Sequence, residues 1–90
     1  MSAARFPLGR VVFTRKALKN LTQEDIVCGL DRHAAGKWGD VDELAGKLNE
    51  AAVCLSLRVS SKHLSAKGVT FWIFTLADRS ETTVLLPEDY

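Results

Sequence analysis

Hydrophobic positions along this chain change period, and the changes divide the chain into expected strands and helices. Residues 9–14 are β-branched and aromatic over a short run, which is typical of a strand. Residues 23–36 and then 41–52 carry apolar side chains at helical spacing. After residue 52 the period falls to two. The strands predicted there cover residues 53–59, 69–76 and 82–87, with a polar loop or ragged hairpin between the first two.

The first predicted helix carries start and stop signals in its own sequence. Thr22 is a good N-cap residue, and Asp25 stands three residues later, in the position that completes a capping box. Gly36 closes the periodic stretch and is the residue type that most often follows a helix. Residues 15–20 are expected only to lead into this helix.

The second predicted helix has the same capping-box spacing in Asp40 and Glu43. Its charged side chains lie opposite an apolar stripe that is expected to face the core. The stripe consists of Val41, Leu44, Ala45, Leu48 and Ala52. The short connection between the helices predicts a helical hairpin, and Trp38 in that connection is expected to fill the core rather than to contact a partner.

The strand predicted over residues 69–76 is apolar on both faces. Val69, Phe71 and Ile73 alternate with Trp72, Phe74 and Leu76. Two helices can cover only one face of a four-stranded sheet, so the second face needs other cover, and a homodimer is its simplest source. The expected fold is a single α+β domain over residues 1–90, in the order β-α-α-β-β-β, with an antiparallel sheet and two helices on one face.

Composition fits this small globular domain. The chain has 90 residues, of which 47% are hydrophobic and 26% are charged. It contains no run of about eighteen apolar residues and no signal peptide, so we expect a cytoplasmic protein without a membrane span. In that setting Cys28 and Cys54 are expected to be reduced and buried.

Charge gives the one directional clue to a partner. The formal net charge is +1, yet the first twenty residues hold five basic side chains and no acidic one. The candidate partner-binding residues are Arg10, Arg15, Lys16, Lys19, Arg58 and Lys62, together with the polar loop at residues 60–67. Such a cluster can meet an acidic protein surface or phosphates. The alternative is a solvated edge that discourages strand pairing.

Candidate chemistry elsewhere in the chain is sparse. Asp78, Arg79 and Ser80 stand between two strands, but with no histidine in the same turn they predict a hairpin turn rather than a catalytic group. His33 is expected near a helix end, where a partial positive charge is favourable, and His63 in a polar loop. The spacing of histidines and cysteines fits no metal site, and the chain has no glycine-rich phosphate loop. We therefore expect no enzyme, cofactor or metal.

Three blocks of sequence resemble a group of short bacterial proteins carried on phages, plasmids and integrative elements. The blocks are KWGDV at residues 37–41, LNEAA at residues 48–52 and FWIFTLADRSETTVLLPEDY at residues 71–90. The chain departs from the group over residues 56–71, which are longer and more basic than the group's tight hairpin. The resemblance implies a mobile-element setting, in which small non-enzymatic proteins often inhibit host defence, as anti-CRISPR and anti-restriction proteins do. It supplies no catalytic residues.

Composition, charge and resemblance together lead to one functional expectation. We expect a non-enzymatic protein that binds and inhibits a bacterial defence complex, of the anti-CRISPR type, by protein–protein contact. The alternative is a small nucleic-acid-binding or regulatory accessory protein that uses the same basic residues.

Overall fold

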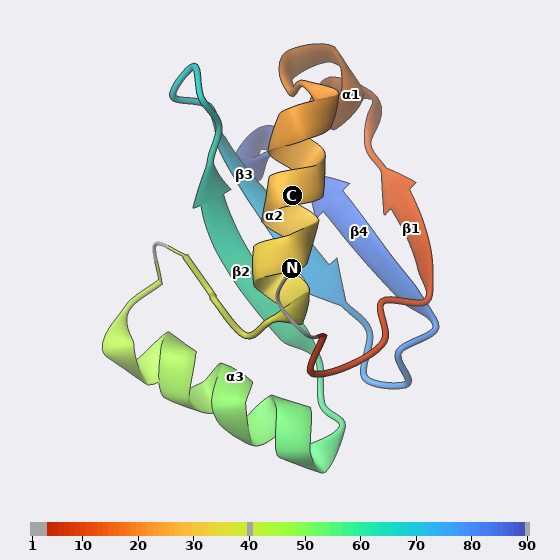
Figure 1. The fold of residues 1–90 in the computed structure, drawn as a ribbon, viewed down its shortest axis with the longest axis vertical. Coiled ribbons are helices and arrows are strands. Elements are labelled where there is room, and N and C mark those ends of the chain that lie inside the picture. The colour runs from red at the N-terminus through yellow and green to blue at the C-terminus, as the bar shows by residue number, and fades with distance from the viewer. Residues whose placement is uncertain (1–3, 40, 90) are drawn as a thin grey trace.

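A four-stranded sheet forms the centre of the protein, with helices on one face and at one end (Figure 1). The computed structural model describes residues 4–39 and 41–89. In chain order the elements are β1 (Arg10–Phe13), α1 (Arg15–Asn20), α2 (Gln23–Ala34), α3 (Glu43–Leu55), β2 (Val59–Leu64), β3 (Thr70–Thr75), β4 (Glu81–Leu85) and the 3₁₀ turn η1 (Pro87–Asp89). The predicted α+β class is confirmed, and residues 15–20 form a short helix of their own.

The sheet is mixed, with the strand order β1-β4-β3-β2. β2 pairs with β3 and β3 with β4 in antiparallel fashion, as predicted. β1 runs parallel to β4, with Arg10 opposite Glu81 and Phe13 opposite Val84, so the prediction of a fully antiparallel sheet is wrong at this pair. Only strands joined by a tight hairpin are bound to run antiparallel, and three helices and two strands separate β1 from β4.

α2 covers one face of the sheet and forms the main core with it (Figure 1). Its backbone comes close to β3 at Gly29, where a Cβ atom would lie only 2.8 Å from the Phe71 ring. The buried members of this core are Ala17, Leu21, Ile26, Phe71, Ile73, Val84 and Leu86. Because α2 lies so close to the sheet, it excludes water from the face that it covers.

The predicted capping box at the start of α2 is present. Thr22 accepts a hydrogen bond from the Asp25 backbone N–H, and the Asp25 carboxylate accepts one from the Thr22 N–H. The same carboxylate also accepts from the Ala66 N–H at 3.1 Å, which ties the β2–β3 turn to the helix. Hydrogen bonds from the Thr22 and Ala66 backbones lower the pKa of Asp25 below its usual range.

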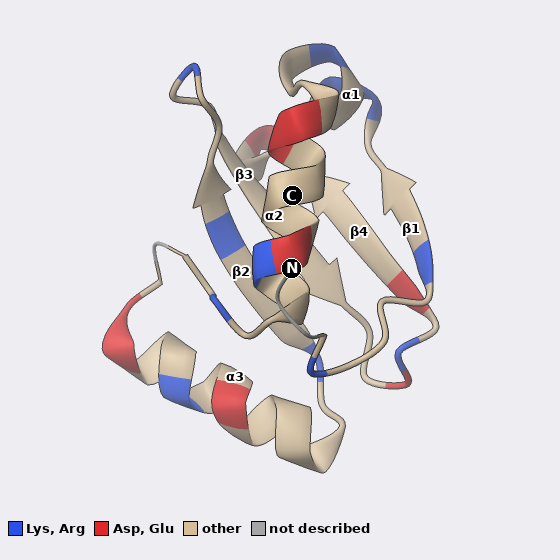
Figure 2. Cartoon of the chain, in the orientation of Figure 1, with Lys and Arg blue, Asp and Glu red and all other residues tan. Residues whose placement is uncertain are grey.

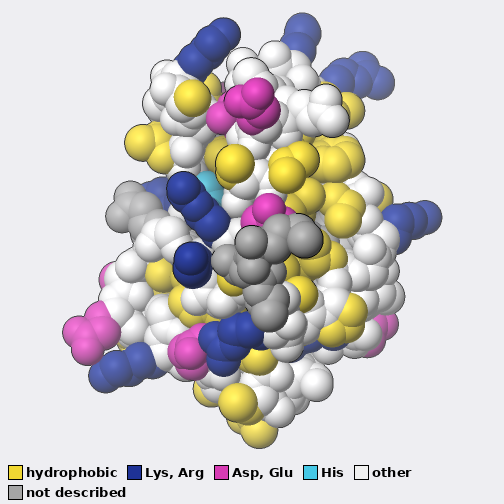
Figure 3. Space-filling model, viewed as in Figure 1, with side chains coloured by type: hydrophobic (Ala, Val, Ile, Leu, Met, Phe, Trp, Pro, Cys, Tyr) yellow, Lys and Arg dark blue, Asp and Glu magenta, His cyan; other side chains and the backbone are white. Residues whose placement is uncertain are grey.

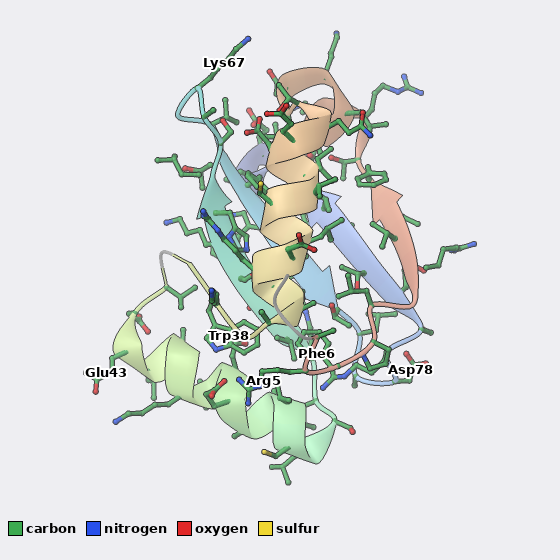
Figure 4. The ribbon with its side chains drawn as sticks, in the orientation of Figure 1. Arg5, Phe6, Trp38, Glu43, Lys67 and Asp78 are labelled. Atoms are coloured by element: carbon green, nitrogen blue, oxygen red, sulfur yellow. The ribbon has the colours of Figure 1, made fainter. Side chains whose placement is uncertain are left out.

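A second core cluster joins the N-terminal segment to α3. It consists of Phe6, Trp38, Ala52 and Val59. Figure 4 shows Arg5, Phe6 and Trp38 side by side between the lower end of α2 and α3, and the Phe6 and Trp38 rings are stacked with centroids 6.3 Å apart. The Glu50 carboxylate accepts from both Arg5 and the Trp38 indole N–H. Trp38 is only 8% exposed, so its predicted place in the core is confirmed.

α3 differs from its prediction in both its position and its rotation. It lies beside β2 at the lower end of the sheet rather than on the face that α2 covers (Figure 1). Its N-cap is Asp42, whose carboxylate accepts from the Ala45 N–H, whereas the predicted cap, Asp40, is outside the described residues. Of the stripe expected to face the core, Leu44 and Leu48 are exposed to solvent.

β2 is displaced along the chain from its prediction. Residues 53–55, expected to begin a strand, continue α3, which ends at Ser56 in the left-handed region with φ 55°. The strand occupies Val59–Leu64 instead, so all of it but Val59 lies in the segment expected to be a polar loop or ragged hairpin. Its inward positions include Ser61 and His63, and these polar side chains hide the apolar alternation by which strands are recognised.

The thiols of Cys28 and Cys54 are free, as predicted, but both are exposed, so their predicted burial is wrong. Each lies on the outward side of a helix, α2 or α3. No helix among residues 4–39 and 41–89 is long and apolar enough to cross a membrane.

Candidate functional site

An apolar groove of about 460 Å³ runs between β1 and α2. We call it the β1–α2 groove. It is lined by Val11, Phe13, Leu18, Leu21, Gln23, Ile26, Val27 and Leu30. Figure 3 shows hydrophobic side chains gathered on this part of the surface, over the space between α2 and β1. The side chains come from β1, α1 and α2, so the groove exists only once the helices have docked on the sheet.

The walls of the groove are open to solvent although its floor belongs to the core. Leu21 and Ile26 are 7% and 8% exposed and form the floor. Leu18 and Val27 on the walls are 58% and 49% exposed. Isolated apolar side chains on a surface are ordinary, but a contiguous hollow lined almost wholly by them marks a surface suited to binding.

The open edge of β1 runs along this groove. Arg10 and Thr14 donate their backbone N–H groups to Ser80 and Val84 of the β4 side, each at 3.0 Å. Since neighbouring residues of a parallel strand direct their backbone groups to opposite sides, those of Val11 and Phe13 point away from β4. The side chains of the same two residues line the groove. A strand laid beside β1 would therefore meet both hydrogen-bonding groups and an apolar surface.

The opposite edge of the sheet is partly closed. The Asn49 side chain donates to the Ser60 carbonyl at 2.6 Å and accepts from the Ser60 N–H at 3.2 Å. The Lys62 N–H donates to the Trp38 carbonyl at 3.0 Å. These bonds satisfy both outward backbone groups of Ser60 and the N–H of Lys62 on β2, whereas Val11 of β1 makes no backbone hydrogen bond on its outer side within the described part of the chain. The two edges thus differ in their readiness to accept a new strand.

Four of the predicted partner-binding residues flank the groove. They are Arg10 on β1 and Arg15, Lys16 and Lys19 on α1, all exposed, and Figure 2 shows blue Lys and Arg positions on both elements. Arg10 makes an ion pair with Glu81 at 3.3 Å. The three bases of α1 make no ion pair with any residue that the structure describes, so their charge is directed to solvent.

The other two predicted residues lie elsewhere, on the face of the sheet that α2 does not cover. The Arg58 guanidinium stands 4.2 Å from the centre of the Phe74 ring, and the Lys62 ammonium stands 5.7 Å from that of Trp72. These cation–π contacts partly cover the second apolar face, for which a homodimer had been the simplest expected cover. The six predicted residues therefore form two groups rather than one site.

The predicted contact loop at residues 60–67 is not a free loop. Ser61, His63 and Ser65 are buried, because residues 59–64 pair with β3 and the Ser65 hydroxyl accepts from the Val69 N–H. Beyond the exposed Leu64 side chain, the exposed part is the tip of the turn, at residues 66–68. Residues 60–65 thus belong to the fold, and the extent of the candidate contact loop is corrected to that tip.

A buried chain of hydrogen bonds crosses the interior between β2 and the N-terminal segment. His63 Nε2 lies 2.7 Å from Ser61 Oγ, which lies 2.6 Å from His33 Nδ1. His33 Nε2 lies 2.8 Å from Thr75 Oγ1, which lies 2.8 Å from Thr82 Oγ1. The chain ends where the Thr82 hydroxyl donates to the Leu8 carbonyl at 2.7 Å. We call this chain the histidine relay.

Hydrogen-bond chemistry fixes the direction of the relay. A carbonyl can only accept, so the Thr82 proton is committed to Leu8, and Thr82 must accept from Thr75. Thr75 in turn accepts from His33 Nε2–H, which leaves His33 Nδ1 to accept from Ser61, and Ser61 accepts from His63 Nε2–H. Every bond then points the same way, and both histidines are neutral with the proton on Nε2.

Burial explains why both histidines stay neutral. Burial, helped by the nearby His63 and Arg79, lowers the pKa of His33 to about 3. Burial and the charge of Arg32 lower the pKa of His63 to about 4. The expectation of a partly positive His33 at the helix end is therefore wrong, because desolvation outweighs the helix dipole at a fully buried position. The relay satisfies each of its buried polar groups and holds α2, β2, β3 and β4 in register.

The turn between β3 and β4 is a hairpin turn, as predicted. Asp78 accepts from the Ser80 N–H at 2.9 Å, and Arg79 adopts a left-handed conformation with φ 62°. The Arg79 guanidinium donates to the carbonyls of Ala52 and Leu57, at the C-terminal end of α3. The Asp78 and Arg79 side chains thus hold turn and helix backbone together.

His33, Ser61, Thr75 and Thr82 of the relay are buried. His63 also lines a pocket of about 300 Å³ with Cys28 and Arg32. Among the described residues, no three His, Cys, Asp or Glu side chains are arranged to hold a metal ion. The β1–α2 groove is therefore the feature that best suits a ligand. The chain matches no protein-family model, no curated protein and no solved structure.

Proposed function

We propose that this protein is a non-enzymatic inhibitor of a bacterial defence complex, of the anti-CRISPR type, and that it binds a subunit of that complex through the β1–α2 groove. The observation that carries the proposal is the open edge of β1 beside an apolar groove. The class of target comes from the resemblance of residues 37–41, 48–52 and 71–90 to mobile-element proteins. Action in the cytoplasm of the host cell is part of the same proposal.

Strand addition is the binding mode that uses both features of the site. An extended segment of the partner pairs with the outward backbone groups of Val11 and Phe13, which supply affinity without regard to sequence. Alternate side chains of the segment enter the groove against Leu18, Val27 and Leu30. The segment is therefore expected to be β-branched or aromatic at every second position.

Charge selects the partner. Arg10, Arg15, Lys16 and Lys19 lie on β1 and α1, two of the three elements that form the groove, so acidic residues in the bound segment are favoured. A second copy of β1 would bring the same four bases against themselves, and like charges at an interface are unfavourable. The site therefore fits a foreign acidic segment better than a second copy of this chain. A subunit held in this way is blocked at the surface that its segment normally occupies.

Restoration of phage growth in a host with an active CRISPR system tests the proposal. The wild-type protein is expected to restore plaque formation, and Val27→Glu is expected to lose this ability because it places a carboxylate in the groove. Leu64→Glu is the matched control, since Leu64 is 64% exposed but lies on β2, away from the groove. Equal protein levels are confirmed by immunoblot. Unchanged interference by every defence system of the host, or full activity of Val27→Glu, would overturn the proposal.

The three unpaired bases of α1 favour a second candidate, a nucleic-acid-binding accessory protein. The salt dependence of binding distinguishes the two candidate functions. Binding through three phosphate contacts weakens about fortyfold between 50 and 200 mM salt. Capture of a partner strand rests on backbone bonds and apolar burial and should change much less over that range. A steep salt dependence that Arg15→Gln reduces, with no effect of Val27→Glu, would favour the accessory function.

A further inference from the structure

α3 exposes a regular apolar stripe that the fold leaves without a partner. The stripe consists of Leu44, Leu48, Ala51 and Leu55, spaced by four, three and four residues. Its three leucines are 67%, 62% and 66% exposed. No other described element presents so many strongly exposed leucines on one line.

The other two sides of α3 are already in use. Asn49 and Ala52 are buried against the domain. A second side carries Glu43 and Lys47, which form an ion pair at 3.4 Å, and Glu50, which binds Arg5. The stripe lies on the third side, so it neither packs on the domain nor mixes with the charged residues. Figure 1 shows α3 at the lower end of the molecule, with its far side facing away from the sheet.

We propose that this stripe binds the same stripe of a second copy of this chain, so that two α3 helices pack antiparallel in a homodimer. Spacing of four and three residues is the pattern by which two helices form a continuous apolar seam. α3 is 13 residues long, or about 20 Å, which gives one such seam of almost four turns.

The stripe is complementary to itself when the two helices run antiparallel. With the helix centres level, Leu44 lies against Leu55 of the second copy, and Leu48 lies against Ala51 of the second copy. Large side chains thus alternate with a small one along the seam, which fills the interface evenly. On the charged flank, Lys47 comes level with Ala52 of the second copy, which leaves it about 3 Å along the axis from Glu50 of that copy and within reach of its carboxylate, and symmetry repeats the pair. The antiparallel arrangement also opposes the two helix dipoles.

A membrane surface fits the stripe less well. Helices that lie on membranes carry mainly Lys and Arg beside their apolar face. The charged side of α3 has two carboxylates and one base, in Glu43, Glu50 and Lys47, and Asp42 caps its N-terminus. Anionic lipids would repel this side, whereas a second α3 offers both signs of charge.

The expected dimer is weak and is independent of the β1–α2 groove. A seam of this length buries less than a standard interface, so dissociation is expected on the order of 1–100 µM. β1 and α3 lie on different sides of the molecule (Figure 1), so both grooves stay open in the dimer. Two grooves on one particle would bind a target with repeated subunits more tightly than one groove does.

Sedimentation equilibrium on the full chain tests the dimer, over concentrations from about 1 µM to about 1 mM that bracket this range. The wild-type mass is expected to rise from the monomer value towards twice that value. Leu48→Lys is expected to raise the dissociation constant about tenfold or more, because it places two like charges in the seam. Leu64→Lys is the matched control, with an exposed fraction of 64% against 62% for Leu48, and should dimerise like the wild type.

Circular dichroism verifies that each variant is folded, as expected for substitutions of exposed residues. A wild-type mass that stays at the monomer value throughout would overturn the proposal. An equal loss of dimer in Leu64→Lys would overturn it too, because it would place the interface on the sheet rather than on α3.

Disulfide capture tests the antiparallel direction. In that arrangement position 47 of one copy lies beside Cys54 of the second copy, so Lys47→Cys in a Cys28→Ala background is expected to form a covalent dimer on mild oxidation. Within one helix the two positions are two turns, about 10 Å, apart, which is too far for an internal disulfide. Adding Cys54→Ala should abolish the product. A wild-type dimer whose Lys47→Cys variant never crosslinks, or crosslinks without Cys54, would overturn the direction.

Discussion

Asn49 and Ser60 are joined by two hydrogen bonds that mimic the pairing of a neighbouring strand. The Asn49 amide donates to the Ser60 carbonyl at 2.6 Å and its oxygen accepts from the Ser60 N–H at 3.2 Å. One side chain thereby closes the outer edge of β2 near the start of the strand. The same contact fixes the rotation of α3, because a helix that directs Asn49 inward must direct Leu44 and Leu48 outward.

Loss of this contact should destabilise the protein measurably. Asn49→Ala leaves the N–H and carbonyl of Ser60 without their partners at a half-buried position, and we expect a loss of about 1–3 kcal/mol in the free energy of unfolding. Urea denaturation measures the change. Asn20→Ala is the control, since Asn20 makes one exposed hydrogen bond to the Lys16 carbonyl and should change stability by less than about 0.5 kcal/mol. Equal effects of the two substitutions would contradict the assigned role.

Two glycines in helix interiors should respond to alanine in opposite directions. A Cβ at Gly29 would lie 2.8 Å from the Phe71 ring, so Gly29→Ala forces α2 away from β3 and should cost about 1–3 kcal/mol. At Gly46 the nearest atom would be Trp38 Cδ1 at 4.0 Å, an ordinary contact, so Gly46→Ala should stabilise α3 by about 0.5–1 kcal/mol. Thermal or urea unfolding of the two variants measures both changes in stability. Stabilisation by both would mean that α2 does not lie so close to the sheet.

Local signals predicted the elements that are stabilised locally. The Thr22–Asp25 capping box and the helical spacing after it place α2 correctly, and the alternation of residues 69–76 with the Asp78 turn places β3 and β4. These features depend on residues that are close in the sequence. Their interactions persist wherever the rest of the chain lies, which is why a pattern can reveal them.

Elements that depend on distant partners escaped prediction. The inward face of β2 carries the polar side chains of Ser61 and His63, so it lacks the apolar alternation of a typical strand. Burial of these side chains is tolerated only because His33 and Thr75 complete the hydrogen-bond chain. The apolar alternation at Val53, Leu55 and Leu57 imitates a strand, yet most of it lies in the last turn of α3.

The candidate site was visible in the sequence only in part. The bases near β1 predicted a binding surface, but they could not show that β1 would lie at an edge or run parallel to β4. The groove forms only because β1 is an edge strand that runs parallel to β4. The order of the strands is set by packing across the whole sheet. The local sequence of β1 therefore does not predict the strand order.

The pH dependence of stability should report the two neutral histidines. Burial holds the pKa of His33 at about 3 and that of His63 at about 4 in the folded protein, against about 6.5 in the unfolded chain. Between these values the unfolded chain binds more protons, so stability is complete above pH 6.5 and falls as the pH drops towards 4. Each histidine should contribute a slope of up to about 1.4 kcal/mol per pH unit.

Urea titrations at several pH values between 4 and 8 measure this slope. His63→Gln removes one titrating group while its amide can still donate to Ser61, so the histidine part of the slope should be roughly halved. Asp25 and Glu50, whose pKa values hydrogen bonds lower, lose their contribution only at more acidic pH. Stability that does not change between pH 7 and pH 5 would show that the histidines are not neutral in the fold.

The direction of the histidine relay makes Thr75 its most sensitive member. Thr75→Val keeps the shape of the side chain but leaves His33 Nε2–H without an acceptor and Thr82 without a donor, both in the dry interior. We expect a loss of about 1–3 kcal/mol in the free energy of unfolding. Thr83→Val, on the half-buried face of β4 and outside the relay, should change stability by less than about 0.5 kcal/mol.

Nitrogen NMR of the histidine rings gives the relay a readout that stability alone does not. In the wild type both rings should show the proton on Nε2, because each Nε2 donates along the chain towards Leu8. In Thr75→Val the hydrogen bond at His33 Nε2 is gone, so its resonance should shift and its proton should exchange faster with water, while His63 changes less. A wild-type His33 protonated on Nδ1 would reverse the donors and acceptors around Ser61 and contradict the assigned direction.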